Sequence, residues 1–151
     1  MPCRLTLKPR VMTFTSKTIF AWVLRGLAAV IMLQTLFFKF TAAPESVYIF
    51  SELGIEPWGR IGSGIMELIA SLLILIPRTT VLGALLAMGL MGGALLSHIF
   101  ILGIAVQGDG GQLFIYALLV LVSASILFWM YRHYLSRFLP KRFVPFPTTH
   151  A

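Results

Sequence analysis

Charged side chains are scarce in this chain of 151 residues. They make up 11% of the sequence, whereas 58% of the residues are hydrophobic. Soluble domains carry roughly 25% charged residues. The composition therefore excludes an ordinary soluble domain and predicts an integral membrane protein, and the length predicts a single domain.

Cysteine and histidine are also rare. Cys3 is the only cysteine, which excludes an internal disulfide, a C-x-x-C redox pair and an iron-sulfur cluster. His133 and His150 lie far along the chain from His98, so we expect no haem held by two membrane histidines. A Gly-rich phosphate loop and a nucleophile elbow are missing as well. The sequence thus predicts no catalytic residue, no metal site and no cofactor bound within the chain, and leaves a diffusible quinone as the candidate cofactor.

Four apolar runs are each about as long as a helix must be to cross a ~30 Å hydrocarbon core, roughly 20 residues. They cover residues 19–38, 60–77, 80–106 and 112–131. The runs are continuous, not alternating, which disfavours the strands of a transmembrane barrel. A helix also satisfies its own backbone hydrogen bonds in lipid. The sequence predicts an all-α fold, an integral membrane four-helix bundle.

Basic residues set the predicted orientation of the bundle. Only Lys39 and Arg60 flank the spans on one side, and the other side carries Arg4, Lys8, Arg10, Lys17, Arg78, Arg132, Arg137, Lys141 and Arg142. The positive-inside rule then predicts that both termini are cytoplasmic, with basic tails at residues 1–18 and 132–151 around a four-helix domain at 19–131. Attraction to anionic lipid explains this charge, and no reader motif indicates nucleic acid. We expect the lipid bilayer as a partner and no nucleic acid.

The connection at residues 39–59 is the longest between spans. Pro44 can begin a helix, Gly54 can end one, and the apolar positions between them form a stripe. We predict a short helix at the outer membrane interface. Trp58 and, in the last span, Tyr116, Trp129 and Tyr131 are predicted as interfacial anchors.

Arg25, Glu67 and His98 are ionisable residues inside predicted spans. A central Arg or acidic residue costs about 2.5–3.5 kcal/mol even on the lower insertion scale, so these side chains should face the bundle and find partners. Lys39 lies on the same face of its helix as Arg25, and Glu67 lies on a face of small and polar residues. A rise of ~1.5 Å per residue predicts that Glu67 and His98 are at similar depth.

Two roles remain open for these residues. Lys39, Glu67, His98 and Arg25 are candidates for a ligand-binding or proton-relay site, in which a basic residue tunes the charge of Glu67. In the structural alternative, Arg25, Lys39 and Glu67 form an ion-pair network that only fixes the helices. The sequence does not decide whether Arg25 or Lys39 pairs with Glu67.

The order of these residues resembles the DoxX family of small bacterial four-helix membrane proteins. The shared pattern starts with an Arg early in the first helix and a Lys at its end, here Arg25 and Lys39. A Leu-Gly-hydrophobic-x-Pro turn follows at residues 53–57 and a Gly-x-x-Glu motif at residues 64–67. The pattern ends with a His late in the third helix, here His98.

This resemblance, which covers about residues 19–131, implies a multi-pass protein of the cell inner membrane. Some relatives are subunits linked to thiosulfate:quinone oxidoreduction or to oxidative-stress complexes, which implies a redox-enzyme partner and a non-catalytic or quinone-interacting role. Two alternatives are a structural or assembly membrane protein without a ligand and a small-solute carrier. A carrier requires a homo-oligomer, because four helices enclose little volume.

Overall fold

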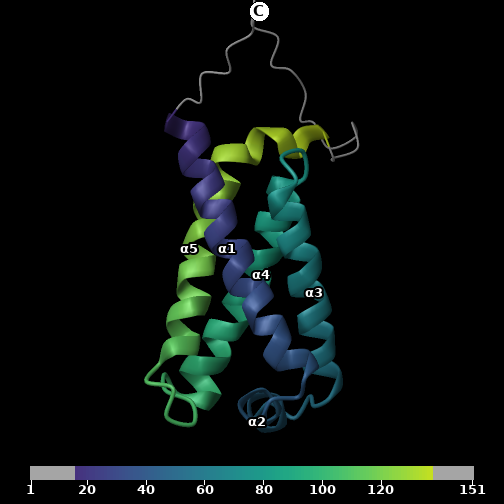
Figure 1. Cartoon of the computed structure of the whole chain (residues 1–151), viewed down its shortest axis with the longest axis vertical. Helices are drawn as coiled ribbons and strands as arrows, with labels where there is room; N and C mark the ends of the chain where they lie inside the picture. Colours follow the sequence, from purple (N-terminus) through teal and green to yellow (C-terminus); the bar gives the residue numbers. More distant parts are fainter. Residues whose placement is uncertain (1–15, 138–151) are drawn as a thin grey trace, which may run out of the picture.

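The computed structural model describes residues 16–137, and every regular element in that range is a helix. Four long helices run side by side: α1 (Ser16–Phe40), α3 (Trp58–Leu75), α4 (Thr80–Ser97) and α5 (Gln112–Tyr131) (Figure 1). Each belongs to a segment that is long and apolar enough to cross a membrane. The predicted all-α architecture with four spans is therefore confirmed. Residues 1–15 and 138–151 of the predicted basic tails lie outside the described residues.

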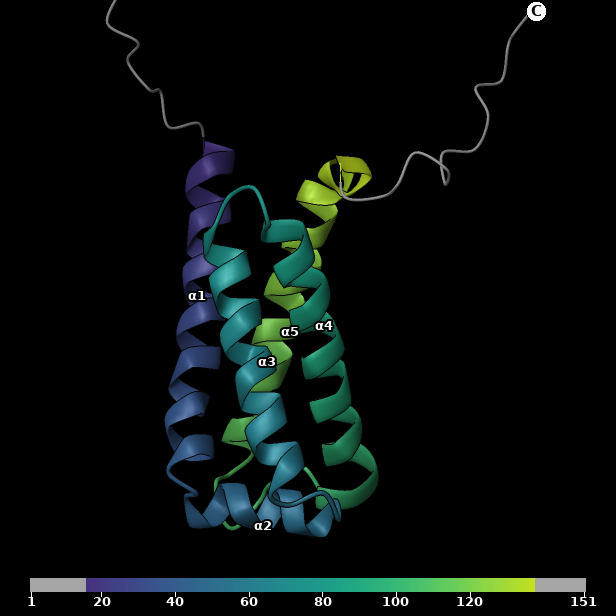
Figure 2. The ribbon, with the colours of Figure 1, turned by 90° about the vertical axis from the view of Figure 1, so that its right-hand side faces the viewer.

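The two ends of the bundle carry different elements, and we call them the tail end and the α2 end. At the tail end lie the start of α1, the turn between α3 and α4, and the 3-10 helix η2 (Arg132–Arg137) that follows α5 (Figure 2). At the α2 end, the short helix α2 (Pro44–Glu52) lies across the long helices. The assignment of the tail end to the cytoplasm stays a prediction of the positive-inside rule.

Helix α2 is the short helix that the sequence predicts in the longest connection. Pro44 stands in its first turn, and Gly54, just beyond its end, has a φ of +70°. The N–H of Gly54 donates to the carbonyl of Ser51 at 2.9 Å, which closes the last turn. Pro and Gly therefore begin and end this helix as their backbone preferences require. Its place at a membrane interface stays a prediction.

The third span ends earlier than its predicted limit at residue 106. Helix α4 continues into one π-helical turn, η1 (His98–Leu102), and the span is Thr80–Leu102. Gly103 follows with a φ of +81°, a conformation that favours glycine. Its carbonyl accepts a hydrogen bond from Nδ1 of His98 at 2.9 Å. The left-handed glycine, held by that histidine, ends the helix inside the apolar run, so hydropathy alone overestimates its length.

Small residues hold the long helices together. The buried alanines of the bundle are Ala21, Ala28, Ala29, Ala70, Ala84, Ala87, Ala117 and Ala124. Such residues let helices approach closely and gain van der Waals contacts in lipid. Near the turn between α3 and α4 the approach is closest, because a Cβ on Gly83 would lie 2.5 Å from the main-chain nitrogen of Ile74. Large apolar side chains instead cover the outside of the bundle.

Helix α1 changes neighbours along its length. Toward the tail end it lies beside α5, where Arg25 contacts the ring of Tyr131. At the α2 end it packs on α3, where the Phe40 ring lies 3.3 Å from the position that a Cβ on Gly64 would take. Helices α1 and α5 thus diverge toward the α2 end (Figure 1). This divergence makes room between the helices at that end.

Candidate functional site

A cavity of about 520 Å³ lies between the long helices at the α2 end. Small-molecule sites typically enclose ~300–1,000 Å³. Most of its lining is apolar, and the polar side chains in it are Gln34, Thr35, Lys39, Glu45, Ser46, Ser63, Glu67, Ser97, His98, Asp109, Gln112 and Tyr116. The structure thus places Lys39, Glu67 and His98 around one cavity, and Arg25 outside it.

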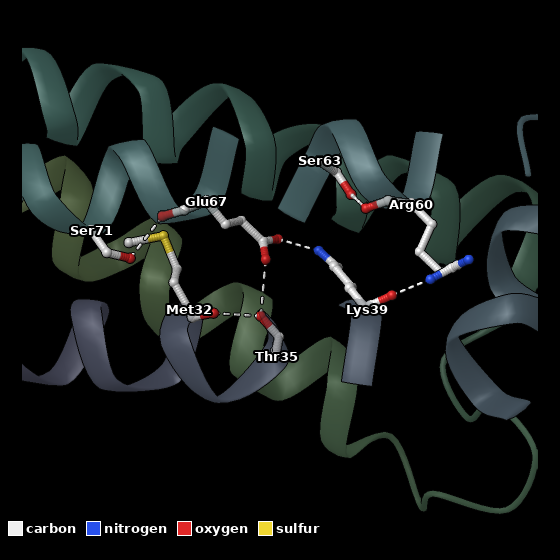
Figure 3. Close-up of polar contacts among 7 residues, drawn as sticks. All are labelled: Met32, Thr35, Lys39, Arg60, Ser63, Glu67 and Ser71. Carbon is white, nitrogen blue, oxygen red and sulfur yellow. Dashed lines mark hydrogen bonds and ion pairs between the residues drawn. The ribbon is translucent and has the colours of Figure 1, made fainter. Parts of the chain in front are cut away.

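An ion pair between the half-buried Lys39 and the buried Glu67 joins α1 to α3 beside the cavity (Figure 3). Nζ of Lys39 lies 2.5 Å from Oε1 of Glu67. The Thr35 hydroxyl, which has one proton to donate, lies 2.9 Å from Oε2 and 2.8 Å from the carbonyl oxygen of Met32. Thr35 and Lys39 reach the same carboxylate because they are one turn apart on α1. The Lys39 and Glu67 side chains are 15% and 6% exposed. Both carboxylate oxygens therefore have partners within the chain.

Arg60 supports this pair from the start of α3. Its guanidinium pairs with Glu56 at 2.8 Å and also donates to the main-chain carbonyl of Lys39 (Figure 3). Carbonyls in the last turn of a helix lack intrahelical partners and carry the negative end of the helix dipole. Arg60 therefore caps the end of α1 and holds the backbone of Lys39, whose side chain binds Glu67.

His98 forms the opposite wall of the cavity, in the π-helical turn η1. Its ring packs edge-on against Phe114, with the ring centroids 5.9 Å apart. Because the carbonyl of Gly103 only accepts hydrogen bonds, Nδ1 of His98 carries the proton. In the neutral ring Nε2 is then an acceptor, and it makes no hydrogen bond with residues 16–137. No hydrogen bond or ion pair joins His98 to Glu67 among the described residues, although both line the same cavity.

Asp109 lies in the connection between η1 and α5, outside the spans. Its carboxylate accepts backbone N–H groups of Val106, Gly111 and Leu113 at 2.8, 2.9 and 3.1 Å. Burial raises the pKa of Asp109, but these hydrogen bonds and the charge of His98 outweigh it, and the pKa lies below the ordinary value of 3.8. Asp109 is therefore ionised at neutral pH and fixes this connection at the mouth of the cavity.

Arg25 belongs to the other half of the bundle. Fourteen residues separate it from Lys39, or about 21 Å along the helix axis. Its guanidinium carbon lies 4.9 Å from the ring centroids of both Trp22 and Tyr131, and the residue is 2% exposed. The ionic partner of Glu67 is thus Lys39 and not Arg25, which resolves the pairing that the sequence leaves open.

The sequence does not predict several of the polar residues that line the cavity. Thr35 carries a hydroxyl one turn before Lys39, but such hydroxyls are too common in helices to indicate a site. Gln112 and Tyr116 form a hydrogen bond of 2.5 Å across one turn of α5. The sequence predicts Tyr116 as an interfacial anchor, and the structure places it in the cavity lining. Only the packing of α5 against the other helices shows that its first turns face the site.

Comparison with known proteins gives one match. A family model described as the DoxX-like family matches residues 23–127. No curated protein and no solved structure matches the chain. The matched segment covers well over half of the chain, runs from α1 into α5, and contains Arg25, Lys39, Glu67 and His98. The chain therefore belongs to the DoxX-like family.

Proposed function

We propose that this protein is a non-catalytic subunit of a redox-linked or oxidative-stress-linked assembly in the bacterial inner membrane, and that its cavity binds a quinone. One observation carries the proposal: a mostly apolar cavity of about 520 Å³ is lined by the Lys39–Glu67 ion pair, whose carboxylate is buried. Membership of the DoxX-like family and four apolar helices support a multi-pass membrane protein. An ionisable pair inside a membrane protein is by default a functional-site hypothesis.

The polar side chains of the cavity suit the head group of a quinone. Quinone oxygens accept hydrogen bonds, and the Lys39 ammonium has three donors, of which one binds Glu67. The amides of Gln34 and Gln112 also line the cavity and are further donors. The hydroxyls of a quinol donate, and Nε2 of His98 is an acceptor for one of them. The same cavity therefore has partners for both forms of the ligand.

The apolar lining suits the remainder of such a molecule. Met32 and Phe50 line the cavity, as do Ile31 on α1 and Ala117 on α5. A lipid-soluble ligand would enter between α1 and α5 and keep its tail against lipid. A bound quinone supplies reversible two-electron chemistry, and the proposal assigns the electron donor to a partner subunit.

The test is the quinone content of the full-length chain extracted from its own membranes in mild detergent. We compare wild type with Glu67→Gln, which removes the charge beside the cavity. The matched control is Glu52→Gln, an exposed acid of α2 at the same end. We expect quinone in the wild type and the control, and a loss of about tenfold in Glu67→Gln. The carboxylate that holds the Lys39 ammonium against the cavity is then gone, and hydrogen bonds from such a charged donor contribute ~1.5–3 kcal/mol. Equal quinone in all three proteins would contradict it.

A second function, a purely structural role, is favoured by the contacts of Lys39 alone. Its ammonium binds α3 through Glu67, and its carbonyl accepts from Arg60 on the same helix. In this case the cavity has no ligand and the polar residues only fix α1 on α3. Wild-type protein that is folded but carries neither quinone nor a partner enzyme would favour this role.

A further inference from the structure

Arg25 is a buried cation without a counter-ion in the described structure. Its Nε is buried and makes no hydrogen bond with any residue in the range 16–137. The rings of Trp22 and Tyr131 lie against the guanidinium at 4.9 Å. Such cation–π contacts contribute attraction but carry no negative charge. A guanidinium has five N–H donors, and two aromatic rings leave its charge unneutralised.

The chain has no acidic side chain to neutralise this charge. All five of its acidic residues fall between positions 45 and 109, and residues 1–44 and 110–151 contain neither Asp nor Glu. Of these five, only Glu67 lies inside a membrane-spanning helix, and both its oxygens are bound, by Lys39 and Thr35. Glu56 pairs with Arg60. The sequence therefore offers no acidic side chain to neutralise Arg25.

The surroundings of Arg25 indicate which kind of anion would suit it. Side chains on a helix lean toward its N-terminus, so Arg25 extends toward Trp22 and the tail end. The Trp22 ring that covers the guanidinium is itself 43% exposed on the outside of the bundle. Lys17, Arg78 and Arg132 are exposed at the same end. The site thus combines a planar donor fork, an exposed aromatic wall and a positive end of the molecule.

We propose that Arg25 is the centre of an anion site that binds the phosphate of an anionic phospholipid in the leaflet at the tail end. Arg binds phosphate with two parallel N–H bonds, and basic sites between helices at the cytoplasmic side bind such head groups. By the positive-inside rule this leaflet is the inner one. The site is independent of the quinone cavity, which lies at the opposite end of α1.

The test measures phospholipid binding by native mass spectrometry on the full-length chain. The probes are phosphatidylglycerol, phosphatidylcholine and inorganic phosphate, each added to protein stripped of lipid in a neutral detergent. The variants are Arg25→Gln and, as a matched control, Arg78→Gln, which removes an exposed cation from the same end. Arg25→Lys keeps the positive charge but removes the planar guanidinium. It also replaces Arg25→Gln in the comparison if that variant does not fold.

We expect wild type to prefer phosphatidylglycerol over phosphatidylcholine. Arg25→Gln should weaken phosphatidylglycerol binding more than about tenfold, since hydrogen bonds to charged groups are lost. Arg78→Gln should weaken it about threefold or less, because an exposed charge is screened. Arg25→Lys should lie between wild type and Arg25→Gln.

Three results would overturn the proposal. Equal losses in Arg25→Gln and Arg78→Gln would mean that only surface charge attracts the lipid. A wild type without preference for phosphatidylglycerol would mean that the site does not select an anionic lipid. Inorganic phosphate that displaces phosphatidylglycerol from wild type at equal concentration would identify free phosphate, and not a lipid, as the ligand.

Discussion

Helix α1 carries a half-buried cation at its α2 end and a buried one nearer the tail end, and their surroundings differ. At the α2 end, Lys39 binds Glu67, and Thr35 binds the second oxygen of the same carboxylate. Toward the tail end, Arg25 lies between two aromatic rings with no acidic residue of the chain available to it. Lys39 therefore links two helices, whereas Arg25 is the residue for which we propose an external anion. A charge inside the bundle that has a counter-ion in the chain can stabilise helix packing, whereas one without such a counter-ion is a candidate for ligand binding.

The same comparison separates the packing of the two ends. Near the tail end, α3 and α4 approach until the backbone of Ile74 lies where a side chain on Gly83 would be. At the α2 end the helices diverge around a cavity of about 520 Å³. The ion pair at the α2 end fixes α1 on α3 where the bundle is most open.

The largest expected effect comes from breaking the pair at the α2 end. Glu67→Leu leaves Lys39 buried without its carboxylate, and should lower the free energy of unfolding in neutral detergent by about 3–5 kcal/mol. The double variant Lys39→Met with Glu67→Leu should recover most of this loss, because no unpaired charge remains. Thermal and denaturant unfolding of the purified chain measure both. A single variant as stable as wild type would contradict the account of the pair.

A smaller loss is expected from the hydroxyl that shares Glu67. Thr35→Val keeps the shape of the side chain but removes the hydrogen bond to Oε2, and should cost about 1.5–3 kcal/mol in unfolding free energy. Ser125→Ala is the control, because its hydroxyl donates only to the carbonyl of Leu121 in its own helix. The control should lose less than about 1 kcal/mol. Equal losses would show that Thr35 does not act through the carboxylate.

Removing the charge of Arg25, toward the tail end, is expected to stabilise the protein. In neutral detergent, Arg25→Met removes a buried charge that has no carboxylate partner, and should raise the free energy of unfolding by about 1 kcal/mol, net of the lost ring contacts. The comparison between the two ends breaks down if Arg25→Met destabilises the protein as strongly as Glu67→Leu does. That result would mean that Arg25 has a counter-ion within the chain.

The smallest effect on stability is expected at Asp109, in the connection beside the cavity. The pKa of Asp109 is lower in the folded protein than its ordinary value of 3.8, so its charge stabilises the fold above pH 3.8. This contribution is lost as pH falls below that value and through the folded pKa. Asp109→Asn should therefore be less stable than wild type at neutral pH, and the gap should close in acid. Unfolding midpoints measured from neutral pH down to about pH 3 test this, with Glu52→Gln as a control that shows no such convergence.

The sequence predicts the architecture because hydropathy alone determines it. The four spans, the short helix that begins at Pro44 and the grouping of Lys39, Glu67 and His98 all follow from run lengths and helical periodicity. The choice between Arg25 and Lys39 does not, since both lie on one face of α1 and only the crossing of α1 over α3 brings Lys39 to the carboxylate. The cavity escapes prediction for the same reason, because it arises from divergence between helices that periodicity does not specify.

Other features depend on contacts between segments far apart in the chain. The sequence indicates only that Arg60 lies at the start of a span. Its bond to the carbonyl of Lys39 forms because the end of α1 lies beside the start of α3, which the sequence does not show. Gly103 ends the third span through a bond to His98, although the run remains mostly apolar up to residue 106. The missing counter-ion of Arg25, by contrast, is partly visible in the sequence, where no acidic residue precedes position 45.

The measurement that tests the central claim most directly is the quinone content of the double variant Lys39→Met with Glu67→Leu, purified beside wild type from the same membranes. This variant separates binding from packing, because it removes the polar wall of the cavity without leaving a buried charge unpaired. We predict a folded protein that has lost its quinone, while the wild type retains it. A folded double variant with as much quinone as wild type would contradict the claim that the Lys39–Glu67 pair anchors the ligand.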